Sequence, residues 1–216
     1  MSSFIKVLLR GLTMSFGGDM VSPKWRGTND YPTMSFAVGF LCSCLGISFR
    51  RDISEVKSLR DALKVHIVVI NKGRRLMDFQ TAGAGTNLKD DLEKMSRVIK
   101  PGGGGSSDIY TKELLADGKF DIILEVADEA LCNKLVEAIK SPVWLPFLGR
   151  KSNHLSNIPF GGVYGTLDEA LAGYPKGVLF IQHVTPSTEG SEPTKDYPLC
   201  EGDNRTTTRY IKESFI

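Results

Sequence analysis

The chain has 216 residues, a hydrophobic content of 41% and a formal net charge of +2 at pH 7. This length and composition are typical of one globular domain with an insertion, and no apolar run is long enough to cross a bilayer. The small net charge excludes a uniformly basic surface, so a nucleic-acid partner would need a local cluster of cations. The amino-terminal residues lack the pattern of a secretory signal. We therefore expect a single domain over residues 1–216, located in the cytoplasm and without membrane contact.

The four cysteines do not have the spacing of a structural zinc site. Cys42 and Cys44 are separated by one residue inside an apolar segment, whereas Cys132 and Cys200 are isolated in the sequence. We expect reduced thiols, mostly buried, in a protein with no bound metal and no cofactor.

The first third of the chain predicts a strand, a loop and a buried helix. Residues 3–10 (SFIKVLLR) have the pattern of a strand, and a glycine-broken loop extends to residue 32. Pro32 marks a helix start, with Thr33 or Ser35 as the N-cap. The following residues, MSFAVGFLCSCLGI, are apolar around nearly the whole helical circumference, which indicates a buried helix. The backbone amides at its amino end would suit an anion.

A short helix over 54–62 and a β-branched strand at 64–71 come next, followed by a strand or extended hairpin at 73–83. His66 lies within the strand pattern, so we interpret it as a structural histidine. Residues 82–108 combine a charged, helix-prone stretch with PGGGGSSD and form an excursion that adds little to a core. The glycine run is not a phosphate loop, because no Gly-Lys-Ser/Thr follows it.

The last part of the chain predicts a second set of core elements. Residues 119–126 have the pattern of a strand, and 128–140 form an amphipathic helix with Leu131, Leu135 and Ile139 on one face. A short helix at 166–174 and strands at 177–184 and 205–215 complete the series. The order of strand, buried helix and strand, then strand, helix and strand, predicts a ferredoxin-like α+β fold with an antiparallel sheet. Such sheets commonly bind RNA, although a fold does not decide a function.

The segment LPFLGRKSNH, at residues 145–154, is the strongest candidate for a binding loop. Its glycine permits a tight turn or a close approach to a ligand. Arg150 and Lys151 would suit a phosphate, and Ser152 and Asn153 offer shorter polar contacts. For an isolated Gly-Arg-Lys-Ser, a solvated surface loop is the simpler interpretation.

No group of residues predicts catalysis. A metal-independent nuclease would need a general base such as His154 or Tyr31, with Lys151 to stabilise charge. A metal-dependent nuclease would need clustered carboxylates, and neither those nor a nucleophile elbow, Walker motif or dinucleotide fingerprint occurs. We therefore expect no catalytic and no metal-binding residue, and a protein that is not an enzyme.

Three segments, in order along the chain, resemble the CasD family of Cascade, the RNA-guided surveillance complex of type I-E CRISPR systems, within the RAMP superfamily. LLRGLTMSFGG (8–18) is similar to the first strand and glycine turn of that family. YPTMSFAVGFLCSCLGI (31–47) is similar to its Pro-Thr-Lys/Arg-Ser-Gly helix, and PFLGRKSN (146–153) to its Tyr-Leu-Gly-Arg-Lys-Ser motif. DFQTAG (78–83) and YTKELLADGKF (110–120) are more loosely similar to the edges of a thumb-like insertion, placed here at 79–117.

The resemblance implies a non-catalytic subunit of an antiviral ribonucleoprotein complex. Such a subunit holds the 5′ handle of the CRISPR RNA and caps the filament of backbone RAMP subunits, beside the large subunit that inspects target DNA. Met34 stands where the family usually has Lys or Arg, so one expected phosphate contact is missing. Together with the basic and polar clusters described above, the resemblance gives these candidate RNA-binding residues: Arg26, Tyr31, Thr33, Met34, Ser35, Arg74, Arg75, Gln80, Arg150, Lys151, Ser152, Asn153 and His154.

Two other functions remain open at this point. CasD relatives in another CRISPR subtype cut the precursor RNA themselves, so the chain could be a metal-independent endoribonuclease of repeat RNA. Alternatively, it could be a structural adaptor whose loops contact only proteins.

Overall fold

The computed structural model describes residues 2–18, 24–49, 51–82, 108–184, 188, 192–196 and 207–216. The helix-prone stretch and the glycine run predicted within residues 82–108, like Cys200, lie outside the described residues.

An antiparallel seven-stranded sheet forms the centre of the described structure, in the order β10-β11-β9-β4-β7-β1-β8. Counted along the chain, β1, helix α1, β4, β7, helix α4 and β8 follow the βαββαβ order, and their strands are adjacent as β4-β7-β1-β8. This confirms the predicted ferredoxin-like α+β fold. The strands are β1 (Ser3–Arg10), β4 (Leu63–Asn71), β7 (Lys119–Val126), β8 (Phe160–Tyr164), β9 (Leu179–Val184), β10 (Glu192–Asp196) and β11 (Thr207–Phe215).

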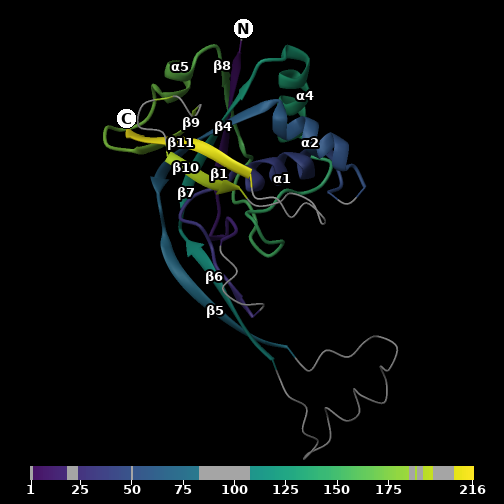
Figure 1. The fold of residues 1–216 in the computed structure, drawn as a ribbon, viewed down its shortest axis with the longest axis vertical. Coiled ribbons are helices and arrows are strands. Elements are labelled where there is room, and N and C mark those ends of the chain that lie inside the picture. The colour runs from purple at the N-terminus through teal and green to yellow at the C-terminus, as the bar shows by residue number, and fades with distance from the viewer. Residues whose placement is uncertain are drawn as a thin grey trace, which may run out of the picture.

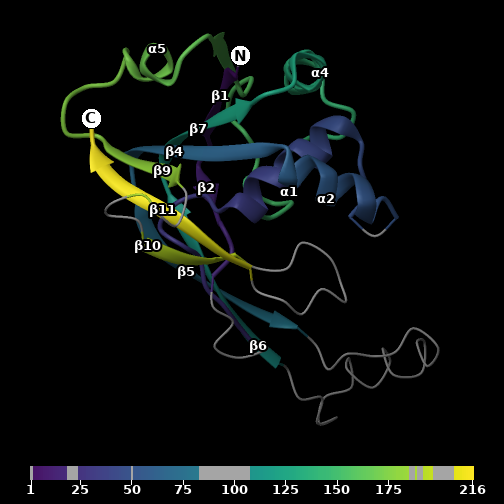
Figure 2. The same cartoon turned by 45° about the horizontal axis from the view of Figure 1, so that its top comes forward.

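Helices α1 (Met34–Leu45), α2 (Ile53–Asp61) and α4 (Glu129–Lys140) lie together on one side of this sheet, and α5 (Leu167–Leu171) lies on the other (Figures 1 and 2). Local chemistry sets their starts. Thr33 caps α1 by accepting a hydrogen bond from the backbone N–H of Phe36, and Asp128 caps α4 by accepting from Ala130 and Leu131. The sequence therefore predicted both helices at the correct places.

Alternation along the strands gives the sheet two apolar faces. Ile5, Val7 and Leu9 of β1 are buried in the main core, which lies under the three helices. The opposite face carries a smaller core under α5, made of Val68, Ile123, Ala170, Val178 and Phe180. Each fully buried aliphatic side chain contributes about 1.5–3 kcal/mol to folding, so both faces stabilise the sheet.

Buried polar groups on the face of the smaller core are paired. His66 is 1% exposed; its Nε2 lies 3.3 Å from Glu125 Oε2, and its Nδ1 accepts a hydrogen bond of 3.1 Å from the backbone N–H of His183. Asp121 is 2% exposed and receives Arg10 Nη1 at 2.6 Å as well as the Tyr174 hydroxyl. His66 therefore joins β4 to β7 and β9, in agreement with the structural role predicted for it.

A long hairpin of β5 (Arg74–Ala82) and β6 (Asp108–Ala116) extends away from the central sheet (Figure 1). Pairing runs from Arg74↔Ala116 to Ala82↔Asp108, so the arms begin before the predicted boundary at residue 79. The other edge of β6 pairs with two short strands, β2 (Thr13–Met14) and β3 (Trp25–Arg26). β3 lies in the segment predicted as a loop, because a two-residue parallel pairing leaves no periodic pattern.

Cys42, Cys44 and Cys132 are buried free thiols, as predicted. Burial, with a smaller effect of Cys42, raises the pKa of the Cys44 thiol to about 12. Among the described residues no group of His, Cys, Asp and Glu is arranged to hold a metal ion. None of the helices in that part of the chain has the length and apolar character needed to span a membrane.

Candidate nucleic-acid interface

The loop at 145–154 is fixed to the start of the chain by backbone hydrogen bonds. The Ser15 N–H donates to Leu148 O at 3.0 Å, and within the loop Leu148 N–H donates to Asn153 O at 2.8 Å. Asn153 N–H closes the turn by donating to Arg150 O at 2.8 Å. Arg150, Lys151 and Ser152 therefore form the tip of a tight, well-anchored turn.

Asn153 holds this turn together from inside. Its side chain is buried, Nδ2 donates to Leu148 O at 3.1 Å, and Oδ1 accepts from Thr13 Oγ1 at 3.0 Å. The polar atoms of its side chain face the protein, which argues against the predicted direct contact of Asn153 with RNA. Its role is to set the shape of the loop that presents Arg150 and Lys151.

Arg150 lies against Arg26, a residue more than a hundred positions away in the sequence. Its Nη2 donates to the backbone carbonyl of Arg26 at 3.3 Å, while Nη1 is buried and makes no hydrogen bond within the described residues. The pKa of Arg150 is lowered, first by burial and then by the positive charge of Arg26, against a weaker attraction from Asp78. Arg150 is thus a partly buried cation near a second positive charge, and an anion beside it would be stabilised.

The middle of the hairpin adds polar groups near Arg26. Gln80 Nε2 donates to Asp78 Oδ2 at 2.7 Å, and Lys112 Nζ donates to Gln80 Oε1. In the strand register, Lys112 is the partner of both Asp78 and Arg26. Lys112 was not among the predicted RNA-binding residues, and only the strand pairing reveals that it lies beside them.

The two arginines that begin β5 have carboxylate partners. Arg75 contacts Asp30 Oδ1 at 2.6 Å and Glu113 Oε2 at 2.7 Å. Its pKa is raised, chiefly by the hydrogen bond to Asp30, although burial acts in the opposite direction. Arg74 lies 3.3 Å from Asp117 and is largely exposed. The charge of Arg75 is thus balanced within the protein, so it serves the base of the hairpin better than an RNA phosphate.

The predicted site residues near the start of α1 have separate roles. Thr33 is occupied as the N-cap and also points toward Phe16 O at 3.5 Å. Met34 is 8% exposed and belongs to the main core, which argues against the predicted RNA contact by this side chain. Tyr31 packs against the same core, whereas Ser35 lines a cavity.

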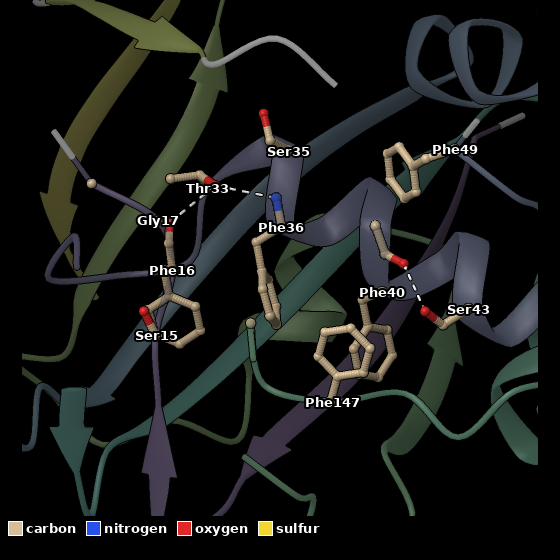
Figure 3. Close-up of a pocket in the computed structure, with 13 residues that line it drawn as sticks. Ser15, Phe16, Gly17, Thr33, Ser35, Phe36, Phe40, Ser43, Phe49 and Phe147 are labelled. Atoms are coloured by element: carbon tan, nitrogen blue, oxygen red, sulfur yellow. Dashed lines mark hydrogen bonds between the residues drawn. The ribbon is translucent and has the colours of Figure 1, made fainter. Parts of the chain in front are cut away.

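Two cavities flank Phe147 of the loop. The first, about 390 Å³, lies between the β2–α1 segment, the outer side of α1 and Gly149 (Figure 3). The second, about 330 Å³, is lined by Trp144, Leu145, Lys151 and His154, among other residues. The structure therefore brings Lys151 and His154 together at the second cavity. This cavity is a second candidate RNA-binding position, separate from the environment of Arg150.

Comparison with known proteins identifies what this architecture is similar to. Residues 4–214 match the family described as CRISPR-associated protein (Cas_Cas5). The chain is 27% identical over 183 residues to the CRISPR system Cascade subunit CasD of Escherichia coli strain K12, covering 81% of this chain and 78% of that protein. Its fold is similar to a chain of a CRISPR RNA-guided surveillance complex, with a TM-score of 0.72, 20% identity and coverage of 98% and 89%. It is also similar to a crystal structure of a Cas protein, with a TM-score of 0.67, 26% identity and coverage of 98% and 94%.

Proposed function

Because the chain belongs to the CRISPR-associated Cas5 family, we propose that it is a subunit of a Cascade-type complex in which it binds the 5′ handle of the CRISPR RNA. The relative in Escherichia coli is itself named a Cascade subunit, and this supports the assignment. In this role the chain would cap the filament of backbone subunits, next to the large subunit and close to target DNA. Its contribution would be binding and positioning, without a chemical step.

The observation that carries the proposal is the environment of Arg150. Its guanidinium is partly buried near the positive charge of Arg26, and one of its nitrogens, Nη1, is buried without a hydrogen bond in the described residues, which favours an anionic ligand over bare protein. A phosphate accepts two parallel hydrogen bonds from a guanidinium, and the rigid turn around Asn153 holds Arg150 ready for it. A sharply bent single strand would bring one of its phosphates to this guanidinium.

Neighbouring groups would extend the contact along the strand. Lys151 and Ser152 are exposed at the tip of the loop, and Lys112 and Gln80 lie further out along the arms of the hairpin. Phe79, on β5, is 68% exposed and offers an aromatic face on which a base can stack. The partners proposed for this surface are thus RNA phosphates and at least one unpaired base.

A charge-reversal experiment tests the proposal. We expect the double substitution Arg150→Glu and Lys151→Glu to weaken binding of an RNA oligonucleotide copied from the repeat-derived 5′ segment of the host's own CRISPR RNA. Loss of two phosphate contacts should also reduce the slope of log affinity against log salt by about 1.4, at about 0.7 for each contact to a single strand. Fluorescence anisotropy at several salt concentrations measures both effects.

The matched control is Lys57→Glu with Lys134→Glu, which makes the same change in net charge on exposed positions of α2 and α4. It should leave both the affinity and the salt slope nearly unchanged. Equal RNA affinity in the wild type and the Arg150/Lys151 variant would reject the proposed placement of the RNA. A wild type with no affinity for this RNA, alone or assembled with its partner subunits, would favour the structural adaptor.

A second function follows from the cavity that Lys151 and His154 share. A histidine next to a lysine can move a proton and stabilise charge in the cleavage of RNA by its own 2′-hydroxyl, without a metal ion. Incubation of the purified chain with repeat RNA in EDTA distinguishes this from simple binding. Cleavage that disappears in His154→Ala would establish the endoribonuclease function. RNA that stays intact at protein excess would reject that function.

A further inference from the structure

The cavity beside α1 is lined by side chains that suit a flat ligand with apolar faces. The rings of Phe36, Phe40, Phe49 and Phe147 line it, and Phe16 lies beside Phe36 (Figure 3). The rings of Phe16 and Phe36 pack edge to face with their centroids 4.9 Å apart, a favourable arrangement of aromatic side chains on one wall. Its volume of about 390 Å³ is within the range of pockets that take small organic groups.

Small residues on α1 make room for this cavity. Ser35, Gly39 and Ser43 follow each other at intervals of four residues and therefore lie on one side of the helix, which lines the cavity. Ser43 Oγ donates to Gly39 O at 3.1 Å, so its oxygen keeps lone pairs that can accept from a ligand. An aromatic surround with hydroxyl groups at the edge suits a ring that has two apolar faces and a polar rim.

The position of the cavity limits which ring it would take. Gly149 lines it, and the next residue along the chain is Arg150, whose guanidinium donates to the backbone carbonyl of Arg26 and has a buried Nη1 without a hydrogen bond in the described residues. A ligand that spans both places must carry an anion next to a flat heterocycle, and this is the chemistry of a nucleotide. The cation beside the mouth thus argues for a nucleobase and against a purely apolar ligand.

We infer that this cavity takes one unstacked base of the RNA whose phosphate lies at Arg150, an inference that rests on the proposed function. The base enters between the phenylalanine rings and turns its polar edge toward the hydroxyl groups of α1. The site holds a single nucleotide out of the stack and so fixes the position of the bound strand along the loop.

A thermodynamic cycle tests this site. Gly39→Leu fills the cavity, because a Cβ at residue 39 already lies 3.4 Å from the Phe49 ring and a longer side chain must extend into the open space. Gly39→Ala, at the same position, leaves most of the volume and serves as the matched control. Each protein is titrated with a series of handle RNAs in which one nucleotide at a time is abasic.

With the wild type and with Gly39→Ala, removal of the base at one position should weaken binding roughly 5- to 150-fold, as expected for loss of one base–aromatic contact. Gly39→Leu should bind the intact RNA more weakly by a similar factor and lose nothing further when that base is absent. If Gly39→Leu does not fold, Phe49→Ala, which removes one wall, must reduce the effect of the same abasic position.

Two results would overturn the inference. RNA binding that is equal for the wild type and Gly39→Leu, or an abasic penalty that is the same in both, would show that no base enters the cavity while leaving the proposed function intact. Absence of RNA binding by the wild type would reject the proposed function and this inference together. The two failures are therefore distinguishable.

Discussion

The backbone carbonyl of Ser15 lies where a side chain of residue 149 would begin. A Cβ placed on Gly149 would be 1.5 Å from Ser15 O, and the φ of Gly149 is +87°. Glycine is thus required twice, by the left-handed backbone and by the contact between the loop and the end of β2. This contact explains physically why the basic pair of the loop follows a glycine.

We expect Gly149→Ala to destabilise the protein strongly and to weaken RNA binding. The left-handed conformation alone costs about 1–2 kcal/mol for a residue with a Cβ, and the overlap with Ser15 adds to this. Gly177→Ala is the matched control, since its φ is +85° and a Cβ there meets nothing within 4 Å. Urea unfolding of both variants separates the cost of the left-handed backbone from the cost of the overlap with Ser15. An equal loss in the free energy of unfolding in the two variants would contradict the role of the contact.

The buried amide of Asn153 gives a second prediction. In Asn153→Ala the Thr13 hydroxyl loses its acceptor and the turn loses a hydrogen bond to Leu148 O, so we expect a loss of about 1–3 kcal/mol in the free energy of unfolding. Ser152→Ala, at the exposed neighbouring position, should change it by less than about 0.5 kcal/mol. Chemical denaturation measures both. A neutral Asn153→Ala would mean that the turn is held by its backbone alone.

The sequence predicted the elements whose pattern is local. The capping residue Thr33, the apolar circumference of α1 and the apolar, β-strand-forming residues of β4 and β7 each depend on neighbours in the chain, and these elements appear where expected. β8 was missed, because Gly161 and Gly162 interrupt its pattern and it pairs only at the edge of the sheet. The predicted positions of helices and strands are therefore correct where local propensity and burial favour the same element.

The candidate site was less predictable because it depends on contacts between distant segments. Nothing in the letters Gly-Arg-Lys-Ser-Asn says that Asn153 turns inward while Arg150 reaches the carbonyl of Arg26. Likewise, the acidic partners of Arg75 come from Asp30 and Glu113, whose proximity follows only from the β5–β6 pairing. Residue type indicated a phosphate site, and tertiary structure decides which cations are available for it.

The double ion pair of Arg75 predicts a local effect at the base of the hairpin. Among the described residues, Arg75→Gln leaves Glu113 with the long contact from Thr28 N–H, at 3.4 Å, and removes the ion pair of Asp30. Since Arg75 is half exposed, we expect a change of at most about 1 kcal/mol in global stability, together with faster amide exchange around Thr28. Hydrogen–deuterium exchange checks this, with Arg74→Gln as control. Unchanged exchange near Thr28 would show that the ion pairs do not hold this segment.

Burial of His66 predicts that stability falls as the pH is lowered. Burial lowers the pKa of His66 below its ordinary value of 6.5, against the opposing effect of Glu125, so the folded protein holds it neutral while the unfolded chain takes up a proton below that pH. The stabilisation is complete above pH 6.5 and is lost as the pH falls toward the lowered pKa. The slope for one proton is at most about 1.4 kcal/mol per pH unit.

Glu125 does not reverse this trend. Burial alone would raise its pKa, but hydrogen bonds and charges of Lys64 and His66 lower it overall, so it stays ionised between pH 7.5 and 5.5. We expect the free energy of unfolding of the wild type to decrease across this interval, and the decrease to be smaller in His66→Gln. His154→Gln, at an exposed histidine, should retain the wild-type decrease. Urea unfolding at four pH values measures it, and an identical slope in His66→Gln would assign the pH dependence to other groups.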